Sequence, residues 1–158
     1  MKYDYIVLIS FWIIVPLVLW KIIPRNRIHE AISAFLIFHM LTWLFSIFLT
    51  NAGLFETPIR FFKYATKISF TLEYLIFPSF AVCFAVSFPK GAGYIKRSTH
   101  YMFWVLMILA FMFLLGTFTN IAQIKAGSLI RSFFNFTIEL WICRQFVLWI
   151  MTQTKNEG

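Results

Sequence analysis

Five apolar runs follow one another along the chain, each close to the length of a membrane crossing. A helix needs about 20 predominantly apolar residues to cross the hydrocarbon core of a bilayer. Lipid offers no water to satisfy backbone polar groups, so such runs are expected to form helices. The sequence therefore predicts an all-α polytopic membrane protein, a bundle of five transmembrane helices in a single domain over residues 1–158, with spans at about 5–23, 31–50, 68–88, 101–124 and 129–151.

The composition supports a lipid environment. Of the 158 residues, 61% are hydrophobic and 13% are charged, against about 45–50% and about 25% in ordinary soluble domains. Aromatic residues alone make up 21% of the chain and outnumber the charged ones. Polar side chains are thus too few to cover a globule of this size, which excludes most soluble folds.

The first apolar run resembles a signal peptide only in part. It follows Lys2 and Asp4, and no small-residue cleavage site precedes Pro24. Signal peptides combine a basic start with such a site. We therefore expect an uncleaved first helix, in which Pro16 introduces a kink that membrane helices tolerate.

The segment between the second and third runs, residues 51–67, is long and aromatic for a solvated loop. Thr57 and Pro58 suit the N-cap and the first position of a helix. Arg60, Lys63 and Lys67 then recur at helical spacing opposite apolar residues, which predicts a short helix lying in the membrane interface. A simple loop is the alternative.

The net charge of +8 comes from basic residues between the apolar runs. There they would meet anionic lipid headgroups, and a nucleic-acid partner is not expected. Without the interfacial segment, the two sides of a five-helix bundle carry two and seven basic residues, the seven being Lys21, Arg25, Arg27, Lys90, Lys96, Arg97 and Lys155. The positive-inside rule then favours an external N-terminus and a cytoplasmic C-terminus in a bacterial cell membrane.

The two cysteines, Cys83 and Cys143, fall inside apolar runs. Free cysteines in such surroundings behave as small hydrophobic side chains. We expect packing rather than a disulfide for both.

Polar side chains inside the runs are costly in lipid and need partners. Glu73 and Arg131 lie at similar depths, within about 3 Å at 1.5 Å per residue, which predicts an ion pair. His39 and Glu139 both lie near the middle of the bilayer and would meet if their helices are neighbours. With the amides that could complete the hydrogen bonds, the predicted polar cluster is Glu73, Arg131, Asn135, Glu139, His39, Asn120 and Gln123.

This cluster has three interpretations: hydrogen bonds that only hold helices together, a cavity for a ligand, ion or proton, or catalysis. Catalysis is the weakest, because zinc-protease, nucleophile-elbow and phosphate-loop motifs are missing. The sole aspartate is Asp4, and His39 is the one histidine inside a run. No catalytic residue, metal or cofactor is expected, although Glu73 could serve as a general base.

Three groups of residues carry a family resemblance. They are residues 24–31, the segment 56–80 with Leu72, Glu73 and Tyr74 followed by Pro78, and Cys143-Arg144 with Trp149. This pattern resembles an uncharacterised family of small multi-spanning integral membrane proteins of endospore-forming Gram-positive bacteria. The resemblance implies a bacterial cell membrane, a spore membrane as a further location, and a bundle of four or five helices. It implies no reaction, but it nominates Glu73 and Arg60.

Taken together, these features predict an integral protein of the bacterial cytoplasmic membrane, a small non-enzymatic subunit or binding protein with a polar intramembrane cluster. The alternatives are an oligomeric transporter or channel subunit and a membrane-embedded enzyme that acts on lipid. The expected partners are membrane lipids, with anionic headgroups at the basic loops, and a second copy of the chain or another membrane protein.

Overall fold

The described part of the chain, residues 2–51, 69–119 and 126–156 of a computed structural model, is helical and contains no strand. The prediction of an all-α protein is confirmed. The elements are α1 (Lys2–Ile22), the 3-10 turn η1 (Arg25–Arg27), α2 (Ile28–Asn51), the π-helical turn η2 (Leu72–Ile76), α3 (Phe77–Val86), α4 (Tyr94–Phe118) and α5 (Ala126–Asn156).

Within the described residues, three segments are long and apolar enough to cross a membrane. They are Tyr5–Ile22, Arg25–Leu49 and Tyr94–Phe118. The continuous η2–α3 helix, Leu72–Val86, is apolar but shorter. Helix α5 has 31 residues, but its charged and amide side chains lower its hydropathy. The structure therefore supports three candidate spans, and the predicted number of five is not confirmed.

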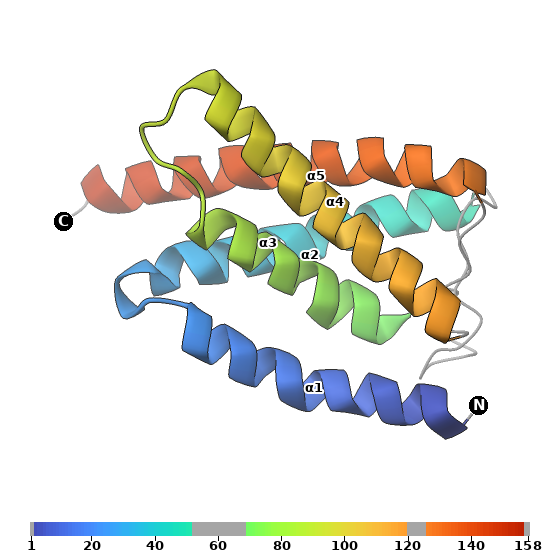
Figure 1. Cartoon of the computed structure of the whole chain (residues 1–158). Helices are drawn as coiled ribbons and strands as arrows, with labels where there is room; N and C mark the ends of the chain where they lie inside the picture. The colour runs from blue at the N-terminus through green and yellow to red at the C-terminus, as the bar shows by residue number, and fades with distance from the viewer. Residues whose placement is uncertain (1, 52–68, 120–125, 157–158) are drawn as a thin grey trace.

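The helices form a bundle in which α2 and α5 run side by side, as Figure 1 shows. Helix α3 packs most extensively against α2 and also touches α1, α4 and α5. The α1–α2 turn, the α3–α4 turn and the C-terminus lie at one end of the bundle, and the N-terminus lies at the other (Figure 1). We call these the C-terminal and N-terminal ends. The α1–α2 and α3–α4 turns, where basic residues cluster in the sequence, thus lie at the same end of the bundle.

Large apolar side chains fill the interior and also cover the outside. Five of them, one each from α2, α3, η2, α4 and α5, are at most 1% exposed: Phe38, Phe84, Leu72, Ile108 and Leu140. Many others face outward, as Trp20 and Phe118 do with at least 80% of their surface exposed. Such extensive exposed apolar surface is unfavourable in water and suits contact with lipid.

One helix start differs from the prediction. Helix α4 begins at Tyr94, several residues before the apolar run. The preceding turn ends at Gly93, and the polar residues between Gly93 and the apolar run already belong to the helix. The predicted interfacial helix with Arg60, Lys63 and Lys67 lies outside the described residues, as do Asn120 and Gln123. Both cysteines are free, and Cys143 packs in the core.

Candidate functional site

Glu73 is placed by an irregular turn of helix. Phe77 N–H donates to the carbonyl of Leu72, five residues back, which defines the π-helical turn η2 around Glu73. Pro78 has no N–H, and a proline ring clashes with the carbonyl four residues before it, so the widened turn accommodates the proline that follows. Single π-helical turns of this kind are frequent at functional sites.

The Glu73 side chain is 3% exposed, and one of its two oxygens is bonded. Ser46 Oγ on α2 donates to Glu73 Oε1 at 2.8 Å. Thr42, one turn before Ser46 on the same face of α2, is also buried. Among the described residues Glu73 Oε2 has no hydrogen-bond partner. A buried carboxylate oxygen left without a donor is energetically costly.

Glu139 on α5 repeats this arrangement from the other side. Its side chain is 1% exposed, and Asn135 Nδ2, one turn earlier, donates to Glu139 Oε1 at 2.7 Å. Glu139 Oε2, like Glu73 Oε2, finds no partner in the described part of the chain. Two buried carboxylates thus each present one unsatisfied oxygen.

Both carboxylates line one small cavity between α2, η2 and α5. Its volume is about 30 Å³, and its polar lining consists of Thr42, Ser46, Glu73, Ser132, Asn135 and Glu139. A cavity needs about 10–15 Å³ to hold one water molecule. The space therefore suits one or two water molecules or a single desolvated ion, and it is too small for an organic substrate. We call it the carboxylate cavity.

The cavity is not lined by Arg131, the cation that the sequence predicted as the partner of Glu73. Arg131 is exposed and does not lie against the buried Glu73, so the predicted Glu73–Arg131 pair is not formed. Arg144 is engaged elsewhere, because its Nη1 donates to Glu30 Oε1 at 3.1 Å. The two buried glutamates therefore line one cavity without either arginine.

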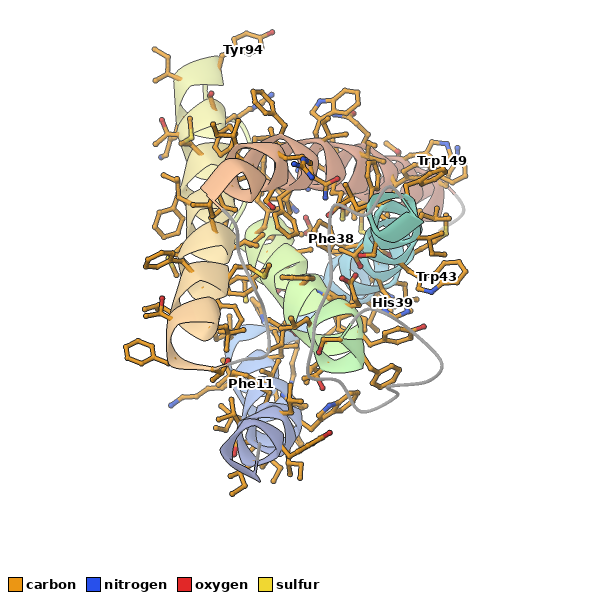
Figure 2. All side chains as sticks on the ribbon, turned by 90° about the vertical axis from the view of Figure 1, so that its right-hand side faces the viewer. Phe11, Phe38, His39, Trp43, Tyr94 and Trp149 are labelled. Carbon is orange, nitrogen blue, oxygen red and sulfur yellow. The ribbon has the colours of Figure 1, made fainter. Side chains whose placement is uncertain are left out.

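His39 lies beside the cavity rather than in it. Its ring packs edge-on against Tyr74, with centroids 4.2 Å apart, and His39 does not line the cavity. Figure 2 shows the neighbouring Phe38 directed into the bundle, whereas Trp43 points away from it. The predicted His39–Glu139 contact is therefore not formed. Of the predicted cluster, the structure brings together Glu73, Glu139 and Asn135.

Sequence reasoning left three cavity residues out of the predicted cluster. Thr42 and Ser46 belong to the polar stripe of α2, and Ser132 lies one turn before Asn135 along α5. Their hydroxyls are weak signals, because serine and threonine in membrane helices commonly bond to the carbonyl one turn earlier. Thr42 does so with the carbonyl of Phe38 at 3.0 Å. Each lies three or four residues from another polar residue, on the same face of its helix. This spacing is the signal that could have predicted their place in the cluster.

Comparisons with protein-family models, with curated proteins and with solved structures find no match to this chain. The function is therefore argued from the geometry.

Proposed function

We propose that this chain is a multi-pass integral membrane protein that binds a small cation, a proton or a monovalent metal ion, in the carboxylate cavity. In this proposal η2–α3 and α5 cross the bilayer together with the three candidate spans, and the protein acts as a small binding or transport subunit of a bacterial cell membrane. The three apolar helices and the lipid-like surface support the membrane location. The basic loops and the sequence resemblance support the bacterial membrane and a cytoplasmic C-terminus.

The observation that carries the proposal is that Glu73 and Glu139 line one cavity and that each has a carboxylate oxygen without a hydrogen-bond partner among the described residues. Two negative charges that line one cavity inside an apolar bundle repel one another and lose their hydration. A positive charge between them removes both costs. A proton shared between the carboxyl groups or a bound metal ion supplies that charge.

The other groups around the cavity suit a hard cation. Ser46, Thr42, Ser132 and Asn135 all carry oxygen atoms, and hard cations prefer oxygen ligands to nitrogen or sulfur. The two carboxylates come from different elements, η2 and α5. Binding of a cation would draw these elements together, and its release would let them separate, which is the coupling that a transport subunit needs.

A catalytic role has one observation in its favour. The Ser46 hydroxyl donates to Glu73 Oε1 at 2.8 Å, as a nucleophile does to a general base. A lipid-acting enzyme must also admit an ester or phosphate group next to the hydroxyl. The volume of about 30 Å³ does not admit one, so the cation site is the better supported function.

Infrared difference spectroscopy of the protein in liposomes tests the cation site. A carboxyl group that gains or loses a proton or a metal ion changes its carbonyl stretching band. We expect the wild type to change this band when the pH is altered or when Na⁺ replaces K⁺. Glu73→Gln and Glu139→Gln should each abolish the change, because glutamine keeps the hydrogen bond from Ser46 or Asn135 but cannot carry the charge.

The control is Glu157→Gln, which removes a carboxylate near the end of the chain and should leave the difference band intact. Circular dichroism and gel filtration establish that the glutamine variants are folded. A wild-type band that responds to neither pH nor Na⁺ would show that the two glutamates serve only to join helices, and the proposed function would be wrong.

A further inference from the structure

A second charged cluster lies near the C-terminal end of the bundle and shares no residue with the carboxylate cavity. Its centre is Glu30, at the start of α2, which is 4% exposed. Three cations contact this one carboxylate. Arg27 and Lys90 donate to Oε2 at 2.8 Å and 3.0 Å, and Arg144 donates to Oε1 at 3.1 Å. The cluster therefore carries an excess of positive charge.

All three guanidinium nitrogens of Arg27 donate hydrogen bonds within the described part of the protein, whereas one nitrogen of Arg144 does not. Besides Glu30, the Arg27 guanidinium donates to the carbonyls of Ala85 and Val86, which end α3. Arg144 is 5% exposed, and its guanidinium lies over the Phe88 ring at 4.2 Å from the centroid. Its Nε–H, however, has no acceptor among the residues that the structure describes. A buried arginine with an unused donor is prepared for one more acceptor.

A large pocket opens beside this arginine. Its volume is about 790 Å³, and it is lined by Lys90 and Gly91 of the α3–α4 turn, Arg97 of α4 and Arg144 of α5, with Glu30 as its one acidic group. Gly91 has a φ of +80°, a conformation that side chains with a Cβ rarely adopt, so a glycine is needed to form this turn. We call this space the basic pocket.

The rest of the basic pocket is apolar and aromatic. Tyr101 of α4 and Trp141 of α5 line it on the side of the bundle interior, Leu148 and Met151 line it toward the C-terminus, and Tyr94 lies at the start of α4. Tyr94 is 90% exposed and projects from the start of α4 (Figure 2). Tryptophan and tyrosine at the end of membrane helices lie at the level of the lipid headgroups. One part of the pocket thus suits an anion and the other an acyl chain.

We propose that the basic pocket binds the phosphate group of an anionic phospholipid. The phosphate accepts hydrogen bonds from Arg144 Nε–H and from Lys90 and Arg97, and the start of an acyl chain lies along Tyr101 and Trp141, which lie deeper along α4 and α5 than Arg97 and Arg144. The charge excess around Glu30 and the unused arginine donor select an anion, and the apolar side selects a lipid over a soluble phosphate. This inference rests on the membrane location and not on the carboxylate cavity.

Native mass spectrometry of the detergent-solubilised protein tests this proposal by titration with phosphatidylglycerol and with phosphatidylcholine. We expect phosphatidylglycerol to bind the wild type about tenfold more tightly than phosphatidylcholine does. Arg97→Gln should weaken phosphatidylglycerol binding about fivefold and the Lys90→Gln, Arg97→Gln double variant about twentyfold, in line with the contribution of a basic residue to anionic lipid binding. Lys96→Gln removes the same charge one residue away, outside the basic pocket, and should have no effect.

Three results would overturn the proposal. The first is equal affinity for the two lipids. The second is an equal loss in Arg97→Gln and Lys96→Gln, which would indicate general surface charge rather than a site. The third is protection from thermal unfolding by inorganic phosphate as large as that by phosphatidylglycerol, which would assign the basic pocket to a soluble anion. Glu73→Gln should bind phosphatidylglycerol like the wild type, so that failure of the cation site and failure of the lipid site are distinguishable.

Discussion

Glu30 and Arg144 form the ion pair on which the C-terminal end of the bundle depends. Both side chains are about 5% exposed and are joined at 3.1 Å across α2 and α5. Removing one partner of a buried pair leaves the other charge uncompensated, at a cost of about 3–5 kcal/mol. We therefore expect Glu30→Ala to lower the free energy of unfolding by about 3 kcal/mol, as measured by denaturation in mixed micelles.

The double variant Glu30→Ala, Arg144→Met completes a thermodynamic cycle. It removes the uncompensated charge together with its partner, so it should be more stable than the sum of the single effects predicts. Lys96→Met, at an exposed position of α4, should stay within about 0.5 kcal/mol of the wild type. Additive single effects would mean that the pair contributes nothing as a pair.

At the same scale, the sequence predicted which residues are polar but not which of them meet. The depth of a residue in the membrane follows from counting residues along the helix. The direction in which its side chain points around the helix axis changes by a small angle with every turn, and these angles add up. Each step of four residues turns a side chain by about 40° beyond a full turn. Arg131 and Glu139 are two such steps apart, about 80° around α5, and the structure buries Glu139 while Arg131 is exposed. The predicted pair with Glu73 used depth alone and therefore failed.

At the scale of the helix, the π-helical turn η2 sets the direction of Glu73. Pro78 follows this turn, at the start of α3, and its missing N–H makes a regular α-helical turn less favourable there. We expect Pro78→Ala to let η2 convert to an α-helix, which rotates the residues before it by about 100°. Glu73 would then leave Ser46, and the cation-dependent infrared band of the carboxylate cavity should weaken or disappear.

The helix content of this variant should stay unchanged or rise, as circular dichroism would record. Pro89→Ala provides the control, because Pro89 lies in the turn after α3 and not in a helix. An infrared response in Pro78→Ala equal to that of the wild type would show that Glu73 is held by its packing alone, without help from the π-helical turn.

Helix ends were predictable where the sequence changes abruptly from apolar to polar residues, and less predictable where this change is gradual. The predicted second span, 31–50, lies within α2, Ile28–Asn51, because the apolar run has polar segments on both sides. The π-helical turn was not predicted, since a π-helical and an α-helical turn differ by one residue in a continuous apolar stretch. Its one signal is Pro78 inside the predicted third span, and the same residue could equally have marked a kink.

At the scale of the whole molecule, the two proposed sites are an acidic cavity in the interior and a basic pocket at one end. The carboxylate cavity lies between α2, η2 and α5, and the basic pocket lies beside the turn that joins α3 to α4. Glu139 and Arg144, five residues apart on α5, belong one to each site. In the two proposals, α5 therefore connects the cation site inside the bundle to the lipid site at its surface.

The number of crossings determines whether this division also separates two sides of a membrane. With five crossings, positions 21, 96 and 155 lie on one side and position 2 on the other. Figure 1 shows the α1–α2 turn, the α3–α4 turn and the C-terminus at one end of the bundle and the N-terminus at the other. If η2–α3 does not cross, position 96 moves to the side opposite position 21. If only α5 does not cross, position 155 moves away from positions 21 and 96. Each uncertain helix thus has its own diagnostic position.

Single cysteines at Lys2, Lys21, Lys96 and Lys155, in a background with Cys83→Ser and Cys143→Ala, make these positions measurable with a membrane-impermeant maleimide. Because basic loops are retained in the cytoplasm, we expect only the variant at Lys2 to be labelled in intact bacterial cells and all four after permeabilisation. Labelling at Lys96 without Lys21 would contradict a crossing by η2–α3, and labelling at Lys155 alone among the three would contradict one by α5. Labelling of Lys21, Lys96 and Lys155 but not Lys2 would keep five crossings and reverse the orientation, which would place the basic pocket at the outer leaflet.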